Sequence, residues 1–200
     1  MYPLFESICI EDGQIQHGKY HELRFKKSYV ETFKIQPNYS LFDGIHLINL
    51  DSTLKYKLRI DYKQSGTRYS ISEYHNSIPT KLKLIKSNSI TYPLKNNKRK
   101  NLNHLYKQRG DSDDVLIVKN GLITDASYSN ILFTNGHQIV TPSTPLLQGT
   151  CRARLLSENK ISAIEIQVAT IDQYHSFQLI NALNDFDEAR WVDTKNIVKK

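Results

Sequence analysis

The sequence has little or nothing of several features that define broad classes of protein. It contains only two cysteines, Cys9 and Cys151, which are too far apart in sequence to form a metal-binding pair. No apolar run approaches the roughly 18 residues that a membrane-spanning helix requires. The N-terminal segment has neither a basic region nor a long apolar core, so no secretory signal is visible. We therefore expect a reduced, cytoplasmic protein that makes no membrane contact.

The chain does carry an excess of positive charge and enough apolar residues for a core. Its formal net charge is +7, and 39% of its 200 residues are hydrophobic, which allows one large domain or two small ones. A basic chain can bind nucleic acid, but an anionic small ligand accounts for the charge equally well. The cations are spread along the whole sequence, which disfavours the alternative of a basic nucleic-acid-binding domain.

Residues 115–142 contain the clearest structural pattern in the sequence. Apolar runs flank Asn120-Gly121 and Asn135-Gly136, and Asn-Gly between such runs is typical of type I′ hairpin turns. We therefore expect a three-stranded meander. Residues 125–130 (DASYSN) interrupt its middle strand with small polar side chains and a carboxylate. Polar groups in a buried sheet need partners, and a bound polar ligand would supply them.

The remaining segments predict a mixture of strands and helices. Alternation predicts strands at residues 4–10, 14–17, 56–62, 67–73, 81–90, 161–168 and 177–183. Helical spacing predicts helices at 19–33 and from Lys100 onward, and residues 37–50 are expected to form a loop with a short helix. Residues 184–200 are expected to be a short strand and a tail.

The organisation that follows is an α+β protein with two domains. Residues 91–99 combine a proline, two asparagines and several cations without periodicity, which is typical of a linker. We expect a small N-terminal α+β domain over residues 1–92, a linker over 93–99 and a C-terminal domain over 100–200.

Four features of the sequence suit an anionic cofactor. Lys100 begins a helix, Asp125 interrupts a strand, residues 149–151 (Gly-Thr-Cys) precede an amphipathic helix, and Arg24 lies on the first helix. Backbone N–H groups at a helix start bind anions, and a guanidinium matches phosphate oxygens in a bidentate manner. Pyridoxal 5'-phosphate needs this set: a lysine for the Schiff base, an acid opposite its pyridine nitrogen and a phosphate cup.

Three of these features also have a plainer interpretation. Lys100 ends a basic triplet at residues 98–100, and such triplets usually form solvated surface. Most glycine-hydroxyl helix starts are only N-caps. Arg24 could be a solvated cation, and His21, three residues before it, is better explained by a structural role than by a binding role.

Five segments resemble, in order, motifs of the class IV aminotransferase family, the fold-type IV pyridoxal-phosphate enzymes. LFESI with YHELRF looks like F-E-[ST] followed by H-x-x-R, and KNLNHL looks like the lysine segment, especially of the aminodeoxychorismate lyase branch. TDASYSNILF resembles T-E-x-x-x-S-N-[IL]-F, LLQGTCR resembles L-x-G-[IV]-[TM]-R, and LINALND resembles the late T-N-[AS]-L segment. The resemblance spans about residues 4–190. It implies a short form with a reduced N-terminal α/β sandwich domain and a C-terminal pseudo-barrel domain.

The resemblance also implies roles for individual residues. Lys100 would form the Schiff base and shuttle the proton, and Asp125 would keep the pyridine nitrogen protonated. The cofactor-binding residues that it implies are Arg24, Lys100, Asp125, Ser129, Asn130, Gly149, Thr150, Cys151, Asn181 and Ala182. Ser7 and Arg59 are the substrate-side candidates, and no metal ligand is expected.

Three residues depart from the family pattern. Asp125 stands where the family usually has Glu, which shortens the side chain by one methylene. Cys151 replaces Thr or Met before the arginine, and a thiol is a weaker donor to phosphate. Ile180 replaces the usual Thr or Cys before Asn-Ala-Leu and removes a possible hydroxyl.

Two reactions fit the resemblance. One is the lyase reaction that converts 4-amino-4-deoxychorismate into 4-aminobenzoate and pyruvate, which would place the protein in folate biosynthesis. The other is an aminotransferase reaction on branched-chain or D-amino acids. The likeness of KNLNHL and LINAL to the lyase branch favours the first. The resemblance also implies a small anionic amino substrate and a homodimer, with no nucleic-acid partner.

Overall fold

The computed structural model describes residues 1–48 and 50–199 and forms two compact units. Unit 1 comprises Met1–Asn76 and Leu94–Lys98, and unit 2 comprises Ser77–Pro93 and Arg99–Lys200. The sequence assigned residues 77–92 to the first domain. They belong instead to unit 2, because strand β5 (Leu82–Lys86) pairs along its length with β6 (Asp114–Lys119). Asn49 of the predicted loop and Lys200 of the predicted tail lie outside the described residues.

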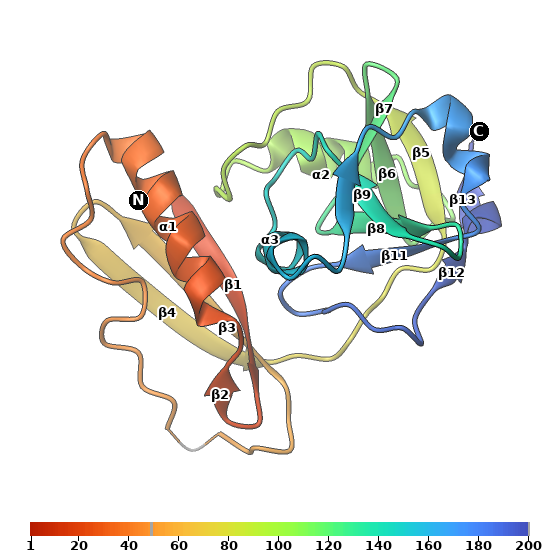
Figure 1. Ribbon diagram of the computed structural model, residues 1–200. Coiled ribbons are helices and arrows are strands. Elements are labelled where there is room, and N and C mark those ends of the chain that lie inside the picture. The colour runs from red at the N-terminus through yellow and green to blue at the C-terminus, as the bar shows by residue number, and fades with distance from the viewer. Residues whose placement is uncertain (49, 200) are drawn as a thin grey trace. The chain divides into compact units, whose positions relative to one another are not determined.

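Unit 1 is an antiparallel sheet with one helix against it (Figure 1). The strand order is β2-β1-β3-β4, with bounds β1 Leu4–Glu11, β2 Gln14–Ile15, β3 Tyr56–Lys63 and β4 Gly66–Glu73. The helix is α1 (Gly18–Phe33). The described part of residues 37–50 forms turns and no helix. The Asp43 carboxylate accepts the Ser40 N–H at 2.8 Å, and Gly44 has a φ of 73°, so the chain closes a turn there.

The core of unit 1 lies between α1 and one face of the sheet. Alternation along β1 places Leu4, Ile8 and Ile10 on that face, where they pack in one cluster with Phe25 and Tyr29 of the helix. The same alternation places one charged residue, Glu6, among these apolar neighbours. Glu6 is fully buried and therefore requires partners on α1.

The described residues of unit 2 form two mixed sheets and two α-helices, which Figure 1 shows side by side with their labels. One sheet has the order β13-β5-β6-β7 and the other has the order β10-β9-β8-β11-β12. The remaining strands are β7 Leu122–Ala126, β8 Asn130–Thr134, β9 Ile139–Pro142, β10 Ser162–Ile164, β11 Ser176–Ile180, β12 Val192–Asp193 and β13 Ile197–Val198. The α-helices are α2 Lys100–Lys107 and α3 Thr150–Ser157, and the 3-10 helices are η1 Val168–Gln173 and η2 Thr194–Asn196.

The two sheets of unit 2 share one apolar core. Leu116 and Ile123 of the first sheet pack in the same cluster as Ile131, Phe133 and Phe177 of the second. The protein thus has the mixed α+β content expected of a fold-type IV enzyme. No helix in the described part of the chain is long and apolar enough to cross a membrane.

The predicted three-stranded meander over residues 115–142 is wrong. The segment contains four strands, and its two hairpins, β6-β7 and β8-β9, belong to different sheets. Residues 127–129 carry the chain from one sheet to the other, in a bend closed by the Ala126 N–H on the Ser129 carbonyl at 2.9 Å. The polar segment that looked like an interrupted strand therefore comprises the end of β7, this crossover and the first residue of β8.

The two Asn-Gly turns also differ. Asn120 and Gly121 have φ values of 51° and 80°, which fits the predicted type I′ turn. In the second turn only Gly136 has a positive φ. The Asn135 side-chain oxygen accepts the N–H groups of His137 and Gln138 at 3.1 and 3.2 Å, which stabilises a longer loop.

Candidate active site

Lys100 is the first residue of α2, and its side chain is exposed. The preceding residue fixes this end of the helix. Arg99 Nη2 donates to the Ser127 carbonyl at 2.7 Å, and its guanidinium lies 4.3 Å from the ring centroid of Tyr128. Because Ser127 follows Asp125 by two residues, the lysine-bearing helix begins beside the crossover that follows the carboxylate in sequence.

The carboxylate of Asp125 is buried and oriented by two hydrogen bonds. Oδ1 accepts from Asn130 Nδ2 at 2.7 Å, and Oδ2 accepts the Leu147 N–H at 2.9 Å. Burial raises the pKa of Asp125 to about 6, although both hydrogen bonds act to lower it. The group is thus largely ionised at neutral pH and held in one orientation. It can accept a hydrogen bond from a protonated ring nitrogen.

Asn130 connects this carboxylate to the start of α3. Its Nδ2 also donates to the Leu147 carbonyl at 2.9 Å, which leaves its Oδ1 against Gly149. A Cβ at Gly149 would lie 1.9 Å from that oxygen, a distance that real Cβ atoms essentially never show. Residue 149 must therefore be glycine for Asn130 to hold Asp125.

Gly149→Ala should displace Asn130 and weaken cofactor binding. We expect a loss of about 1–3 kcal/mol in the free energy of unfolding, the usual cost of overpacking, together with a higher dissociation constant for pyridoxal 5'-phosphate. Gly18→Ala is the matched control, since a Cβ there meets its nearest atoms at an ordinary 3.4 Å. Chemical denaturation and a cofactor titration measure both quantities. Equal behaviour of the two variants would contradict the proposed packing.

The start of α3 presents backbone N–H groups. Gly149 is its N-cap, and Thr150 and Cys151 are its first two residues. The N–H groups of a first turn have no intrahelical acceptor, and the helix dipole favours an anion near them. The Cys151 thiol, by contrast, donates to Asp185 Oδ1 at 3.1 Å. Only the backbone of Cys151 is thus suited to a phosphate.

Residues 181–184, in the predicted LINALND motif, form a tight turn. Asn181 Oδ1 accepts the N–H groups of Leu183 and Asn184 at 2.8 and 2.9 Å, and Ala182 lies within this turn. Asn181 Nδ2 reaches across to Ser129 Oγ at 3.0 Å. The turn is therefore tied to the crossover that follows Asp125.

In unit 1, Arg24 is bound to Glu6. Arg24 Nε donates to Glu6 Oε1 at 2.8 Å, its Nη2 contacts Oε2, and His21 Nδ1 lies 2.6 Å from Oε2. Burial would raise the pKa of Glu6, but the Arg24 charge and the His21 hydrogen bond outweigh it and lower that pKa to about 2. Burial lowers the pKa of His21 more than Glu6 raises it, so His21 is a neutral donor in a structural role.

Glu6→Gln should destabilise unit 1 strongly, because it leaves the Arg24 charge without its buried counter-ion. We expect a loss of about 3–5 kcal/mol in the free energy of unfolding at pH 7. The folded pKa of Glu6, about 2, lies below its ordinary 4.5, so its contribution is present above pH 4.5 and is lost as the pH falls toward 2.

Urea denaturation across this pH range measures the effect. The wild type should lose stability on acidification, and Glu6→Gln should lose less. Glu11→Gln, at the exposed end of β1, is the control and should follow the wild type. Parallel pH profiles of wild type and Glu6→Gln would contradict the assignment.

The two substrate-side candidates lie on the other face of the unit 1 sheet. Ser7 and Arg59 are direct cross-strand partners on β1 and β3, whereas Glu6 faces α1. Arg59 Nη2 donates to Asp61 Oδ1 at 2.7 Å and to Asn97 Oδ1 at 2.8 Å, so its guanidinium is already engaged. Within unit 1, Arg24 is therefore not grouped with Ser7 and Arg59.

In unit 2, direct contacts join several predicted residues. Asp125 contacts Asn130, Asn130 adjoins Gly149, and Ser129 contacts Asn181. The other predicted residues of this unit, on adjoining segments, are Lys100, Thr150, Cys151 and Ala182. The described residues contain no group of acidic, histidine and cysteine side chains able to hold a metal ion.

Sequence reasoning missed four residues of these networks. Glu6 was part of a quoted motif but received no role, although an acid on the apolar face of a strand signals a buried ion pair. Arg99 directly precedes the lysine. Arg154 and Asp185 form an ion pair at 2.6 Å between segments distant in sequence. No local sequence pattern predicts such a pair.

Comparison with known proteins gives the class. A family profile described as amino-transferase class IV matches residues 3–186, so the chain belongs to this family. It is a pyridoxal-phosphate-dependent enzyme of the lyase or aminotransferase kind. The residues of unit 2 suit that cofactor, because they supply an exposed primary amine, a buried oriented carboxylate and helix-start N–H groups.

Three similar proteins illustrate the members of the family that this chain resembles. An uncharacterized protein of Haemophilus influenzae is 38% identical over 187 residues, covering 92% of this chain and 99% of its own length. The crystal structure of a proposed 4-amino-4-deoxychorismate lyase from Haemophilus somnus 129PT is 34% identical, with a TM-score of 0.88 over 93% of this chain and 98% of that chain. A proposed branched-chain aminotransferase from Thermotoga maritima, 17% identical with a TM-score of 0.72, covers 96% of this chain and 75% of its own length, and shares the fold.

Proposed function

We propose that the protein is a lyase that converts 4-amino-4-deoxychorismate into 4-aminobenzoate and pyruvate. The observation that carries this is the Haemophilus somnus relative, a proposed lyase of this kind, which is 34% identical over 98% of its length. The likeness of residues 100–105 to the lysine segment of the lyase branch supports the same reaction.

The chain supplies the groups that this reaction requires. Pyridoxal 5'-phosphate, when bound, acts as an electron sink for a carbanion at the substrate carbon. The Lys100 amine would bind the cofactor and then, once released, remove a proton from the substrate carbon. Asp125 would hold the proton of the ring nitrogen. The N–H groups of Thr150 and Cys151, with that of Ala182, would bind the phosphate, because the Asn181 N–H already donates to the Asn184 carbonyl at 2.9 Å.

A product assay tests this proposal. Purified holoenzyme incubated with 4-amino-4-deoxychorismate should release 4-aminobenzoate, detected by its fluorescence, and an equal amount of pyruvate. The alternative is an aminotransferase of branched-chain or D-amino acids. Glutamate formation from such amino acids and 2-oxoglutarate, without release of 4-aminobenzoate, would establish that alternative and contradict the lyase proposal.

We also propose a cytoplasmic homodimer that takes part in folate biosynthesis. Family resemblance supports the dimer, and the reaction product supports the pathway. Light scattering of the purified protein measures the mass of the assembly. A mass near that of one 23.2 kDa chain would contradict the dimer.

A further inference from the structure

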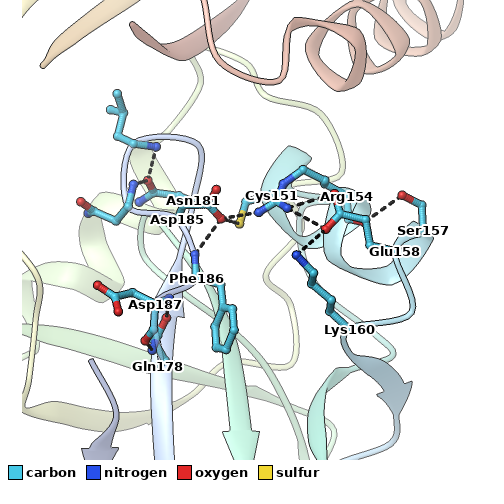
Figure 2. Close-up of polar contacts among 12 residues, drawn as sticks. Cys151, Arg154, Ser157, Glu158, Lys160, Gln178, Asn181, Asp185, Phe186 and Asp187 are labelled. Carbon is cyan, nitrogen blue, oxygen red and sulfur yellow. Dashed lines mark hydrogen bonds and ion pairs between the residues drawn. The ribbon is translucent and has the colours of Figure 1, made fainter. Parts of the chain in front are cut away.

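Asp185 lies at the centre of a polar network in unit 2 (Figure 2). Its Oδ1 accepts three hydrogen bonds: from the Cys151 thiol at 3.1 Å, from Arg154 Nη2 at 2.6 Å and from the Phe186 N–H at 2.7 Å. Its backbone carbonyl accepts from Arg190 Nη2. One carboxylate oxygen thus ties α3 to the segment that follows β11.

The partners of Asp185 on α3 are buried and held in place. Cys151 and Arg154 are three residues apart, so they lie on one face of the helix. Arg154 Nη1 also donates to both oxygens of Glu158 at 3.0 and 2.8 Å, and Lys160 pairs with Glu158 at 3.1 Å. Charged groups on both sides fix the guanidinium, which fixes the Asp185 carboxylate in turn.

The thiol serves this network as a hydrogen-bond donor. Burial and the Asp185 charge raise the pKa of Cys151, so the sulfur stays protonated at neutral pH. Burial would raise the pKa of Asp185, but its hydrogen bonds and the Arg154 charge outweigh burial and lower it. A neutral donor and an ionised acceptor are the two states that the hydrogen bond needs.

The two segments joined by Asp185 are those assigned to the cofactor phosphate. Residues 149–151 are the N-cap and the first two residues of α3, and residues 181–184 form the turn that Asn181 closes and ties to Ser129. Asp185 directly follows this turn. The turn is therefore held to the Asp125 crossover at one end and to α3 at the other.

We propose that Asp185 is a positioning residue for the cofactor phosphate: through Cys151 and Arg154 it sets the start of α3 against the 181–184 turn. It acts without touching the cofactor. The proposal rests on the assignment of these two segments to the phosphate in the proposed function, and it is independent of the substrate.

The test compares pyridoxal 5'-phosphate with pyridoxal, which lacks the phosphate, in titrations of cofactor-free protein. The wild type should bind the phosphorylated form more tightly. Asp185→Ala and Asp185→Asn should raise its dissociation constant roughly tenfold, by analogy with the lower end of the effect of residues that orient metal ligands. Both variants should leave the dissociation constant of pyridoxal unchanged.

The Cys151 thiol, which donates to Asp185, offers a second pair of variants. Cys151→Ser keeps a hydrogen-bond donor to Asp185 and should retain most of the preference for the phosphorylated form, whereas Cys151→Ala should lose part of it. Glu188→Gln, an exposed carboxylate three residues beyond Asp185, is the matched control and should behave as the wild type does. If Asp185→Ala fails to fold, Asp185→Asn, which keeps the side-chain shape, decides the question.

Two outcomes would overturn the inference, and they are distinguishable. If the wild type prefers the phosphorylated form and both Asp185 variants keep that preference, or lose both ligands equally, Asp185 does not position the phosphate site. If the wild type binds the two forms equally, the assignment of residues 149–151 and 181–184 to the phosphate is wrong, and the inference fails with it.

Discussion

Lys100→Ala is expected to abolish turnover and to leave the protein folded. The side chain is exposed at the first position of α2, so its removal creates no cavity and breaks no buried contact. The amine, however, supplies both covalent attachment of the cofactor and proton removal from the substrate. We expect the rate to fall by about 10⁴-fold or more, since general base catalysis alone accounts for 10²–10⁴.

Steady-state assays of product release measure this effect, and thermal unfolding tests the fold. Lys107→Ala, at the other end of the same helix and also exposed, is the matched control and should retain full activity. An active Lys100→Ala with the visible absorbance of the wild type would show that another lysine carries the chemistry.

Asp125→Ala should cause the second-largest loss. We expect the rate to fall roughly 10²–10³-fold, the scale for removal of one fixed electrostatic contact to developing charge, and the cofactor to bind more weakly. Asp125→Glu restores the carboxylate usual in the family and should recover much of the activity. Comparing kcat and cofactor affinity of the two variants checks both expectations. A fully active Asp125→Ala would show that Asp125 is not the acid that contacts the ring nitrogen.

The pH dependence of cofactor binding provides an independent test of the same residue. The pKa of Asp125 is raised to about 6 by burial, and only its ionised form offers the negative charge that strengthens a hydrogen bond from the protonated ring nitrogen. Affinity for the cofactor should therefore fall as the pH drops through about 6 in the wild type. Asp125→Ala should lack this step. Titrations of cofactor-free protein between pH 5 and pH 8 reveal it, and an unchanged profile would contradict the role.

Local patterns in the sequence predicted much of the secondary structure. Alternation placed β1, β3 and β4 to within one or two residues, and helical spacing placed α1 and the start of α2. Asn120-Gly121 correctly predicted its turn, because two adjacent residues that tolerate positive φ are typical of type I′ hairpin turns. These features depend on interactions between near neighbours, which the sequence displays directly.

The meander was mispredicted because the alternation of apolar and polar residues along a strand does not reveal whether successive strands belong to one sheet or to two. Residues 125–130 looked like a polar interruption of a single strand, whereas they include the end of β7, the crossover at residues 127–129 and the start of β8 in the other sheet. Sheet membership is decided by partners such as β5 and β11, which lie far away in the sequence. The polar composition was nevertheless a correct signal that this segment has an unusual place in the fold.

The buried ion pairs were likewise beyond local reasoning. Glu6 meets His21 and Arg24 because α1 packs on one face of the sheet, and Arg154 meets Asp185 across 31 residues of sequence. Such contacts arise from tertiary packing. They determine where Arg24 and the start of α3 are held, which the sequence motifs alone do not indicate.

The most direct test of the account is the position of the cofactor on the chain. Holoenzyme should be reduced with borohydride, digested and analysed by mass spectrometry. We expect a stable pyridoxyl-phosphate adduct on Lys100, in the peptide that contains the start of α2, and no other modified lysine. An adduct on a different lysine, or no adduct in a preparation shown to contain the cofactor, would contradict it.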